Sequence, residues 1–118
     1  MKTTNALLIA FIILTITSCG TLTSTTSIEG KNSFVLGNNK HGVFSVRLKN
    51  ISKSDVIVHR APIDGGRHSF ETVTPGKTVT VKVEKNTALV IDNQGLNQVN
   101  VELYVMGDTG LSMGYKNQ

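Results

Sequence analysis

The feature that most constrains the fold is a two-residue alternation of apolar and other side chains in three separate segments. These segments are 43–50 (VFSVRLKN), 78–84 (TVTVKVE) and 98–105 (QVNVELYV). Their alternating apolar residues are Phe44, Val46 and Leu48 in the first, Val79, Val81 and Val83 in the second, and Val99, Val101, Leu103 and Val105 in the third. Successive side chains of a strand point to opposite faces, so the alternation predicts strands with one face in a core and the other in water. No ten-residue window after residue 18 shows the spacing of an amphipathic helix.

Shorter segments add further expected strands. Residues 55–60 (DVIVHR) and 88–92 (ALVID) are predicted to be more fully buried, whereas 67–73 and 111–115 carry a weaker strand pattern. A short strand at 34–36 is also expected. We predict that 34–36 and 111–115 lie at sheet edges, where each could pair with a strand of another protein.

Two turn signals organise these strands. The sequence DGG at 64–66 supplies residues that tolerate positive φ and predicts a tight hairpin. The sequence TPGK at 74–77 predicts a type II turn, which splays a hairpin and should therefore arch between two sheets. Seven or eight short strands within 34–118 predict an all-β fold, a small antiparallel β-sandwich, with a small β-barrel as the alternative.

Parts of the domain resemble known bacterial modules. The sequence LKNIS at 48–52 followed by a strand, and TPGK at 74–77 followed by another, resemble immunoglobulin-like or fibronectin-like envelope modules. The resemblance implies an immunoglobulin-like sandwich. The buried Trp and paired cysteines of antibody domains are absent, and this fold hosts many functions, so the resemblance implies no particular activity.

The first eighteen residues have the pattern of a secretory signal peptide. Lys2 is followed by nine uninterrupted apolar residues at 6–14 and then by small and polar residues up to Ser18. A helix that spans a bilayer needs about 20 apolar residues, so this run is too short to cross one. Residues 1–18 are therefore predicted to direct export and to be removed.

The lone cysteine refines this interpretation. Ile16-Thr17-Ser18-Cys19 resembles the lipobox of bacterial lipoproteins. The resemblance implies that the chain is cut before Cys19 and that this residue carries acyl chains, of which two or three would hold a protein at a membrane without a spanning helix. In that family an Asp after the cysteine favours the inner membrane of enteric bacteria. Gly20 therefore favours a lipid-anchored protein on the outer membrane, facing the periplasm.

The segment after Cys19 is rich in Thr and Ser. Because small polar residues bury little apolar area, residues 19–33 are predicted to form a lipidated, flexible tether, and 34–118 a single β domain. Without Lys2, the exported part has 11 Lys and Arg against 8 Asp and Glu, a net charge of +3. These charges are spread out and lack interleaved aromatic residues, so no nucleic-acid partner is expected.

Three histidines raise the question of a metal site. His59 and His68 flank the expected hairpin turn, and with Asp64 they form a weak candidate site for Zn²⁺ or Cu²⁺. No metal-binding spacing such as H-x-H supports this site, and solvent-exposed strand histidines are the simpler interpretation. We therefore predict no cofactor.

An outer strand face carries a weak candidate ligand site. Tyr104 is predicted to point outward and could form a platform for a sugar, with Arg47 and Lys49 as cations for an anionic ligand. The preferred interpretation is that Tyr104 only stabilises the sheet through a cross-strand pair.

Function is predicted mainly by exclusion. The chain has no G-x-S-x-G elbow and no supported pair of catalytic carboxylates, so it is not expected to be an enzyme. We predict an envelope lipoprotein whose sandwich binds another envelope protein, in assembly or as an inhibitor or immunity protein. The alternatives are a binder of an anionic or carbohydrate envelope ligand and, third, the histidine metal module.

Overall fold

The computed structural model describes residues 19–117, apart from the side chains of Cys19 and His68. The predicted signal peptide, residues 1–18, lies outside the described residues, as does Gln118. The described chain is all-β and forms nine strands without a helix. The strands are β1 Cys19–Ile28, β2 Asn32–Leu36, β3 Phe44–Asn50, β4 Val56–Pro62, β5 His68–Val73, β6 Thr78–Val83, β7 Thr87–Asp92, β8 Val99–Asp108 and β9 Met113–Asn117.

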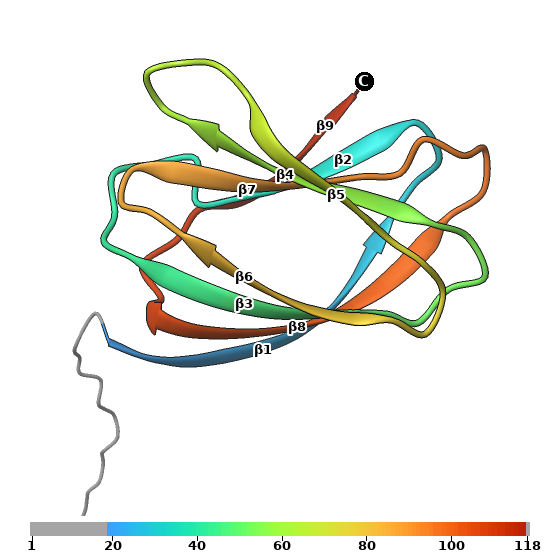
Figure 1. The fold of residues 1–118 in the computed structure, drawn as a ribbon, viewed down its shortest axis with the longest axis horizontal. Coiled ribbons are helices and arrows are strands. Elements are labelled where there is room, and N and C mark those ends of the chain that lie inside the picture. Colours follow the sequence, from blue (N-terminus) through green and yellow to red (C-terminus); the bar gives the residue numbers. More distant parts are fainter. Residues whose placement is uncertain (1–18, 118) are drawn as a thin grey trace, which may run out of the picture.

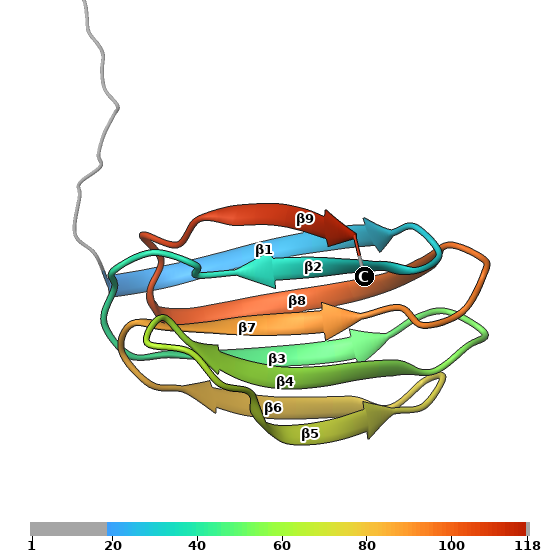
Figure 2. The ribbon, with the colours of Figure 1, turned by 90° about the horizontal axis from the view of Figure 1, so that it is seen from above.

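The strands form two antiparallel sheets packed face to face (Figure 1). Sheet A has the order β1-β8-β3-β6, and sheet B has the order β5-β4-β7-β2-β9 (Figure 2). The chain passes from one sheet to the other at every connection except the β4–β5 hairpin. The predicted β-sandwich is confirmed and the sheets do not close into a barrel; the nine strands exceed the expected seven or eight by the strand that lies in the predicted tether.

The alternation in the sequence sets which side chains enter the core. In β3, Phe44, Val46 and Leu48 are buried, while Arg47 and Lys49 are exposed. Each fully buried Val, Leu or Phe side chain contributes about 1.5–3 kcal/mol relative to an exposed one, so the facing rows hold the two sheets together. These rows include Ile28, Leu36, Val56, Val58, Val73, Val83, Leu89, Ile91, Val101, Leu103 and Val105.

The predicted hairpin and the predicted arching turn are both present, although the hairpin connection is the five-residue segment 63–67 and not a tight turn. Gly65 and Gly66 adopt positive φ between the paired strands β4 and β5. At the second turn the Lys77 N–H donates to the Thr74 carbonyl at 3.0 Å, and Gly76 has a φ of 81°. This turn joins β5 of sheet B to β6 of sheet A, so it arches between the sheets as its type predicts.

The predicted flexible tether is corrected by the structure. Residues 19–28 form the ten-residue strand β1, which pairs along its whole length with β8, from Cys19 opposite Asp108 to Ile28 opposite Val99. Its alternate residues Thr26 and Ile28 are buried. Thr is β-branched and fits a pleated, half-buried surface, so a Thr-rich segment beside an open strand forms a strand despite its polarity.

Two fully buried asparagines hold loops that follow strands. Asn50 Nδ2 donates to the Ser54 and Val73 carbonyls at 2.7 and 2.9 Å. Asn93 Nδ2 donates to the carbonyls of Ile28 and Asn97 at 3.0 and 2.7 Å. Buried backbone carbonyls need such donors, so both amides are structural. Residues 19–117 contain no helix, and therefore none that is long and apolar enough to cross a membrane.

Candidate functional site

The expected edge strands are confirmed in part. Residues 34–36 lie in β2, which pairs with β7 on one side and β9 on the other, so they are not an edge. Residues 113–115 lie in β9, which is the edge strand of sheet B. The longest edge strand, β1, lies in the segment that was predicted to be a flexible tether.

Strand β1 has one neighbour and an unpaired second edge among the described residues. It is ten residues long, its register with β8 is continuous, and it contains neither a charged residue nor proline. Natural sheets protect exposed edges with charges, prolines, bulges or very short strands. Strand β1 shows none of these protective features, so its backbone N–H and C=O groups are open to another strand.

The other edges are protected. Strand β5 has a register shift between Val58 and Arg60, a positive φ of 62° at Ser69, and a carboxylate at Glu71, which lies opposite the core residue Val58. Strand β6 carries Lys82, and β9 is only five residues long and carries Lys116. The contrast marks β1 as the edge that is available for pairing.

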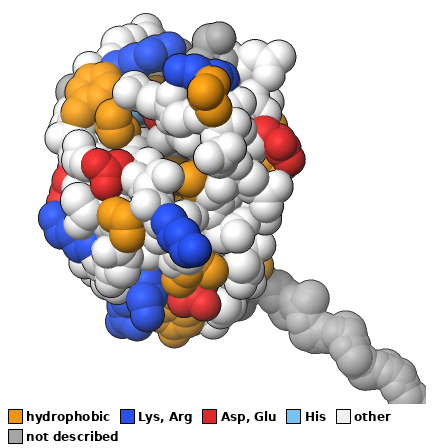
Figure 3. Space-filling view, turned by 90° about the vertical axis from the view of Figure 1, so that its right-hand side faces the viewer, with side chains coloured by type: hydrophobic (Ala, Val, Ile, Leu, Met, Phe, Trp, Pro, Cys, Tyr) orange, Lys and Arg blue, Asp and Glu red, His pale blue; other side chains and the backbone are white. Residues whose placement is uncertain are grey.

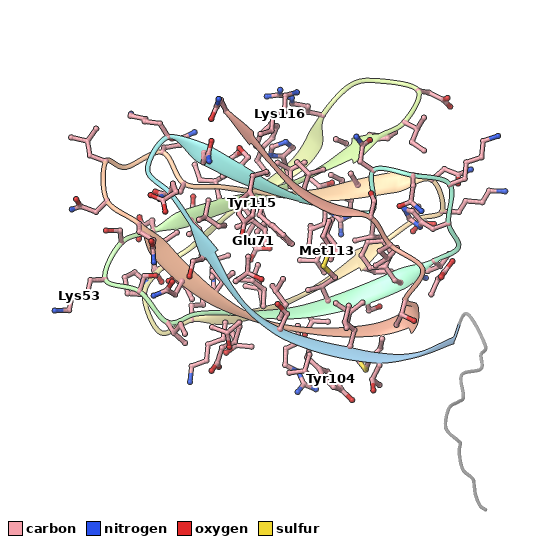
Figure 4. All side chains as sticks on the ribbon, turned by 180° about the vertical axis from the view of Figure 1, so that it is seen from behind. Lys53, Glu71, Tyr104, Met113, Tyr115 and Lys116 are labelled. Carbon is pink, nitrogen blue, oxygen red and sulfur yellow. The ribbon has the colours of Figure 1, made fainter. Side chains whose placement is uncertain are left out.

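Beside the free edge of β1, sheet B extends one strand beyond sheet A, and we call this the stepped margin. Sheet B has five strands and sheet A four, and β9 and β1 lie at the same margin of the two sheets (Figure 2). Met113 and Tyr115 of β9 lie opposite the core residues Leu36 and Phe34 and point toward the space between the sheets (Figure 4). Met113 is nevertheless 48% exposed and Tyr115 58%. Sheet A offers these side chains no fifth strand to pack on.

The three predicted ligand residues come together on the outer face of sheet A. Tyr104 lies opposite Arg47, and Glu102 lies opposite Lys49. Figure 4 shows Tyr104 on the outer side of the sandwich. They line a shallow hollow of about 310 Å³, together with Thr23 and other residues of β1.

The contacts within this hollow favour a structural role for Tyr104. The Arg47 guanidinium lies 5.3 Å from the centre of the Tyr104 ring, so a cation already covers one face of the expected sugar platform. Lys49 lies opposite Glu102, whose negative charge weakens the attraction of Lys49 for an anionic ligand. The cross-strand interpretation of Tyr104 therefore accounts for the observed contacts.

The strand pairing does not bring the three predicted metal ligands, His59, His68 and Asp64, together. His68 lies opposite Arg60 rather than His59, and Asp64 lies in the turn between β4 and β5. No group of three His, Cys, Asp or Glu suited to a metal ion occurs in the part of the chain that the structure describes. His59 instead faces Asp92, with 3.2 Å between His59 Nδ1 and Asp92 Oδ2.

His59 belongs to a buried polar cluster on the outer face of sheet B. Ser33 donates a hydrogen bond to the second carboxylate oxygen of Asp92, and the His59 ring stacks on Phe70 with 4.7 Å between ring centres. His59 is only 2% exposed. Burial lowers the pKa of His59, the Asp92 charge opposes this change, and the nearby Arg67 charge adds to it. The balance of these effects favours the neutral form of the ring.

This cluster is not a hydrolytic triad. A triad needs the serine hydroxyl on the histidine, whereas the Ser33 hydroxyl is directed to Asp92. Sequence reasoning missed Ser33 and Asp92. Asp92 ends a segment read as a buried strand, and a carboxylate at a buried position was the available signal for a hydrogen-bonded partner.

No protein-family model matches the chain, and no curated protein sequence is significantly similar to it.

Proposed function

We propose that the chain is a non-enzymatic, lipid-anchored envelope protein that binds another envelope protein by accepting one of its strands at the free edge of β1. The observation that carries this proposal is the unprotected ten-residue edge of β1 beside the stepped margin of sheet B. Strand addition derives affinity from backbone hydrogen bonds and specificity from alternate side chains.

The margin also favours a particular kind of partner strand. A strand added to β1 would become the fifth strand of sheet A, and its inward side chains would face Met113 and Tyr115. Those residues are large and apolar, so the partner strand should alternate apolar and polar residues. Covering them also removes exposed apolar area from water, at about 25 cal/mol for each Å².

The membrane anchor is supported by the sequence alone. The lipobox residues Ile16, Thr17 and Ser18 lie outside the described residues, and so does the side chain of Cys19. We propose acylation of Cys19 and a location on the outer membrane, facing the periplasm. A role in envelope assembly and a role as an inhibitor or immunity protein both fit this mode of binding.

The anchor is tested separately from the interaction. We expect the native polypeptide to begin at Cys19 and to carry acyl mass, and Cys19→Ser to keep residues 1–18 and lose that mass. Intact-mass spectrometry of the membrane fraction measures both. A native chain that begins at Met1 with a free thiol would contradict the anchor without bearing on strand addition.

The interaction is tested with a photo-crosslinking residue at Thr23 in the native envelope. We expect one main crosslinked protein, retained in about 0.5 M salt because strand addition does not depend on surface charge. Thr25→Lys gives β1 the kind of charged side chain that protects natural sheet edges, and it should weaken the crosslink. The matched control, Thr80→Lys on the exposed face of β6, should retain it.

Two further readouts identify the binding mode. In the purified complex, backbone amides of β1 should gain protection from hydrogen exchange. Tyr115→Ser should weaken the complex without unfolding the domain, since Tyr115 is mostly exposed in the free protein. Equal crosslinking by the Thr25→Lys and Thr80→Lys variants, or unchanged β1 exchange in the complex, would rule out strand addition.

A further inference from the structure

The outer face of sheet B is unusual for a β-sandwich. Along each strand of a sandwich, outward residues normally alternate with core residues and are polar and solvated. All six residues of β7, Thr87–Asp92, are instead buried, including Ala88, Val90 and Asp92 of the outer row. This face is concave: a hollow of about 440 Å³ lies over β7, and we call it the outer trough.

The rims of the outer trough come from the two edges of sheet B. Figure 1 shows the β4–β5 hairpin and the end of β9 rising above β7 on the upper side of the molecule. Arg67 from the hairpin and Lys116 from β9 line the trough, on opposite sides of β7. Basic side chains also gather along the upper margin in Figure 3, on the side of sheet B.

The floor of the trough divides into an apolar and a polar part. Val35, Ala61, Ala88 and Val90 form the apolar part, and their small side chains leave room above the sheet. Ala61 lies opposite Ala88, and Val90 lies opposite Val35 on one side and His59 on the other. Because Ala88 and Val90 are alternate residues of β7, the apolar side chains form one continuous patch that ends at His59.

The polar part is the Ser33–Asp92–His59 cluster. Lys116 lies directly opposite Ser33, and the charge of Arg67 acts on His59, so both cations adjoin this part. His59 Nδ1 is buried and makes no well-aligned hydrogen bond despite its 3.2 Å approach to Asp92.

The charges of the lining are unequal. Arg67 and Lys116 contribute +2, and Asp92 is the one acidic residue of the lining. The Asp92 carboxylate is also partly compensated, because it accepts a hydrogen bond from Ser33 and adjoins His59. With His59 neutral the lining carries a net charge of +1, and an incoming anion meets two exposed cations above one buried, compensated carboxylate.

We propose that the outer trough binds an anionic amphiphile, a small molecule with a carboxylate or phosphate group and an apolar chain. The anionic group would lie between Arg67 and Lys116, above the polar cluster, and the chain would lie along Val90, Ala88 and Ala61. The hollow has the size of a small-molecule site, and such sites combine an apolar lining with a few placed polar groups. This site uses the outer face of sheet B, whereas a strand added to β1 would face the inward side chains of β9, so the two proposals involve different surfaces.

The test separates the charge from the chain with four probes. Octanoate and octyl phosphate carry both, inorganic phosphate carries only the charge, and 1-octanol carries only the chain. Each is titrated into ¹⁵N-labelled protein of residues 20–118, and amide shifts are followed by NMR. We expect octanoate and octyl phosphate to shift the amides of Val35, Ala88 and Val90 in a saturable way, and the other two probes to bind at least tenfold more weakly.

Variants then test the residues. Arg67→Gln and Lys116→Gln should each weaken octanoate binding about fivefold, the effect of losing one partly exposed charge contact. Lys53→Gln, which removes an exposed cation from the loop after β3, should have no effect. Binding of 1-octanol as tight as octanoate, binding of phosphate as tight as octyl phosphate, or equal loss in the Lys53→Gln control would each overturn the proposal.

Discussion

At the scale of single residues, the buried amide of Asn50 is the clearest determinant of stability. Asn50→Ala would leave the Val73 and Ser54 carbonyls and the Ser52 N–H without their partner. An unsatisfied buried group costs about 1–3 kcal/mol, so we expect a loss of about 2–4 kcal/mol in the free energy of unfolding. Urea denaturation measures this loss. Asn39, which also makes three such hydrogen bonds but on the surface, provides the control, and Asn39→Ala should cost clearly less.

His59 determines how stability depends on pH. Its pKa is lowered from 6.5 in the fold, chiefly by burial, so below 6.5 the unfolded chain binds more protons than the folded one. The stabilisation is therefore complete above pH 6.5 and is lost as the pH falls toward the lowered pKa.

The Tm measured by circular dichroism should fall as the pH is lowered from about 7 to about 5. His59→Gln should flatten this dependence. Asp108 does not interfere, because backbone N–H groups of Gly42 and Gly110 lower its pKa from 3.8, below this window. An equally steep dependence in the His59→Gln variant would show that another group is responsible.

At the scale of elements, strand β1 distinguishes the structure from the flexible tether that composition suggests. Ile28 of β1 is fully buried, whereas Thr25 of the same strand is exposed. Ile28→Ala should reduce the free energy of unfolding by about 2–5 kcal/mol, the usual cost of a deleted core side chain. Thr25→Ala should cost less than about 1 kcal/mol. Similar small effects for both variants in urea denaturation would indicate that β1 is not docked.

The turn between β5 and β6 depends on one glycine. Gly76 has a φ of 81° and open space around the position of a Cβ atom, so a substitution there changes conformational strain without a steric clash. Gly76→Ala should destabilise the domain by about 1–2 kcal/mol. Gly114→Ala, also in open space but without positive φ, should change the Tm little. A neutral Gly76→Ala would mean that the turn can adopt another type.

At the scale of the whole molecule, connectivity predicts slow folding. All strand pairs except β4–β5 join segments that are distant in the sequence, since every other connection changes sheet. Non-local pairing requires loop closure before contacts form, so refolding should take milliseconds to seconds. Stopped-flow fluorescence of Tyr104 and Tyr115 can measure it. A transition complete within the dead time would contradict this expectation.

Much of the fold could be read from local patterns. The alternation in 78–84 and 98–105 predicted β6 and most of β8, and TPGK at 74–77 predicted both the turn and the change of sheet. The failures occurred where a segment's structure depends on its neighbour. Strand β1 forms because β8 extends to Asp108 and offers it a partner, and the paired residues are 71 (Ile28 and Val99) to 89 (Cys19 and Asp108) positions apart in the sequence.

The candidate sites follow the same division. Period two predicted that Arg47 and Tyr104 each point outward from their own strands, but only the pairing of β3 with β8 places the Arg47 cation over the Tyr104 ring. Ser33, His59 and Asp92 come from β2, β4 and β7, and only the strand order of sheet B makes them neighbours.

The sequence by itself determined the all-β class, the inward side chains and the turns, because these depend on residues within a few positions of each other. Tertiary structure alone decided which strands lie at the edges, which outer face is concave and which polar groups meet under it. These depend on pairings between distant segments, whose free energy no local pattern contains.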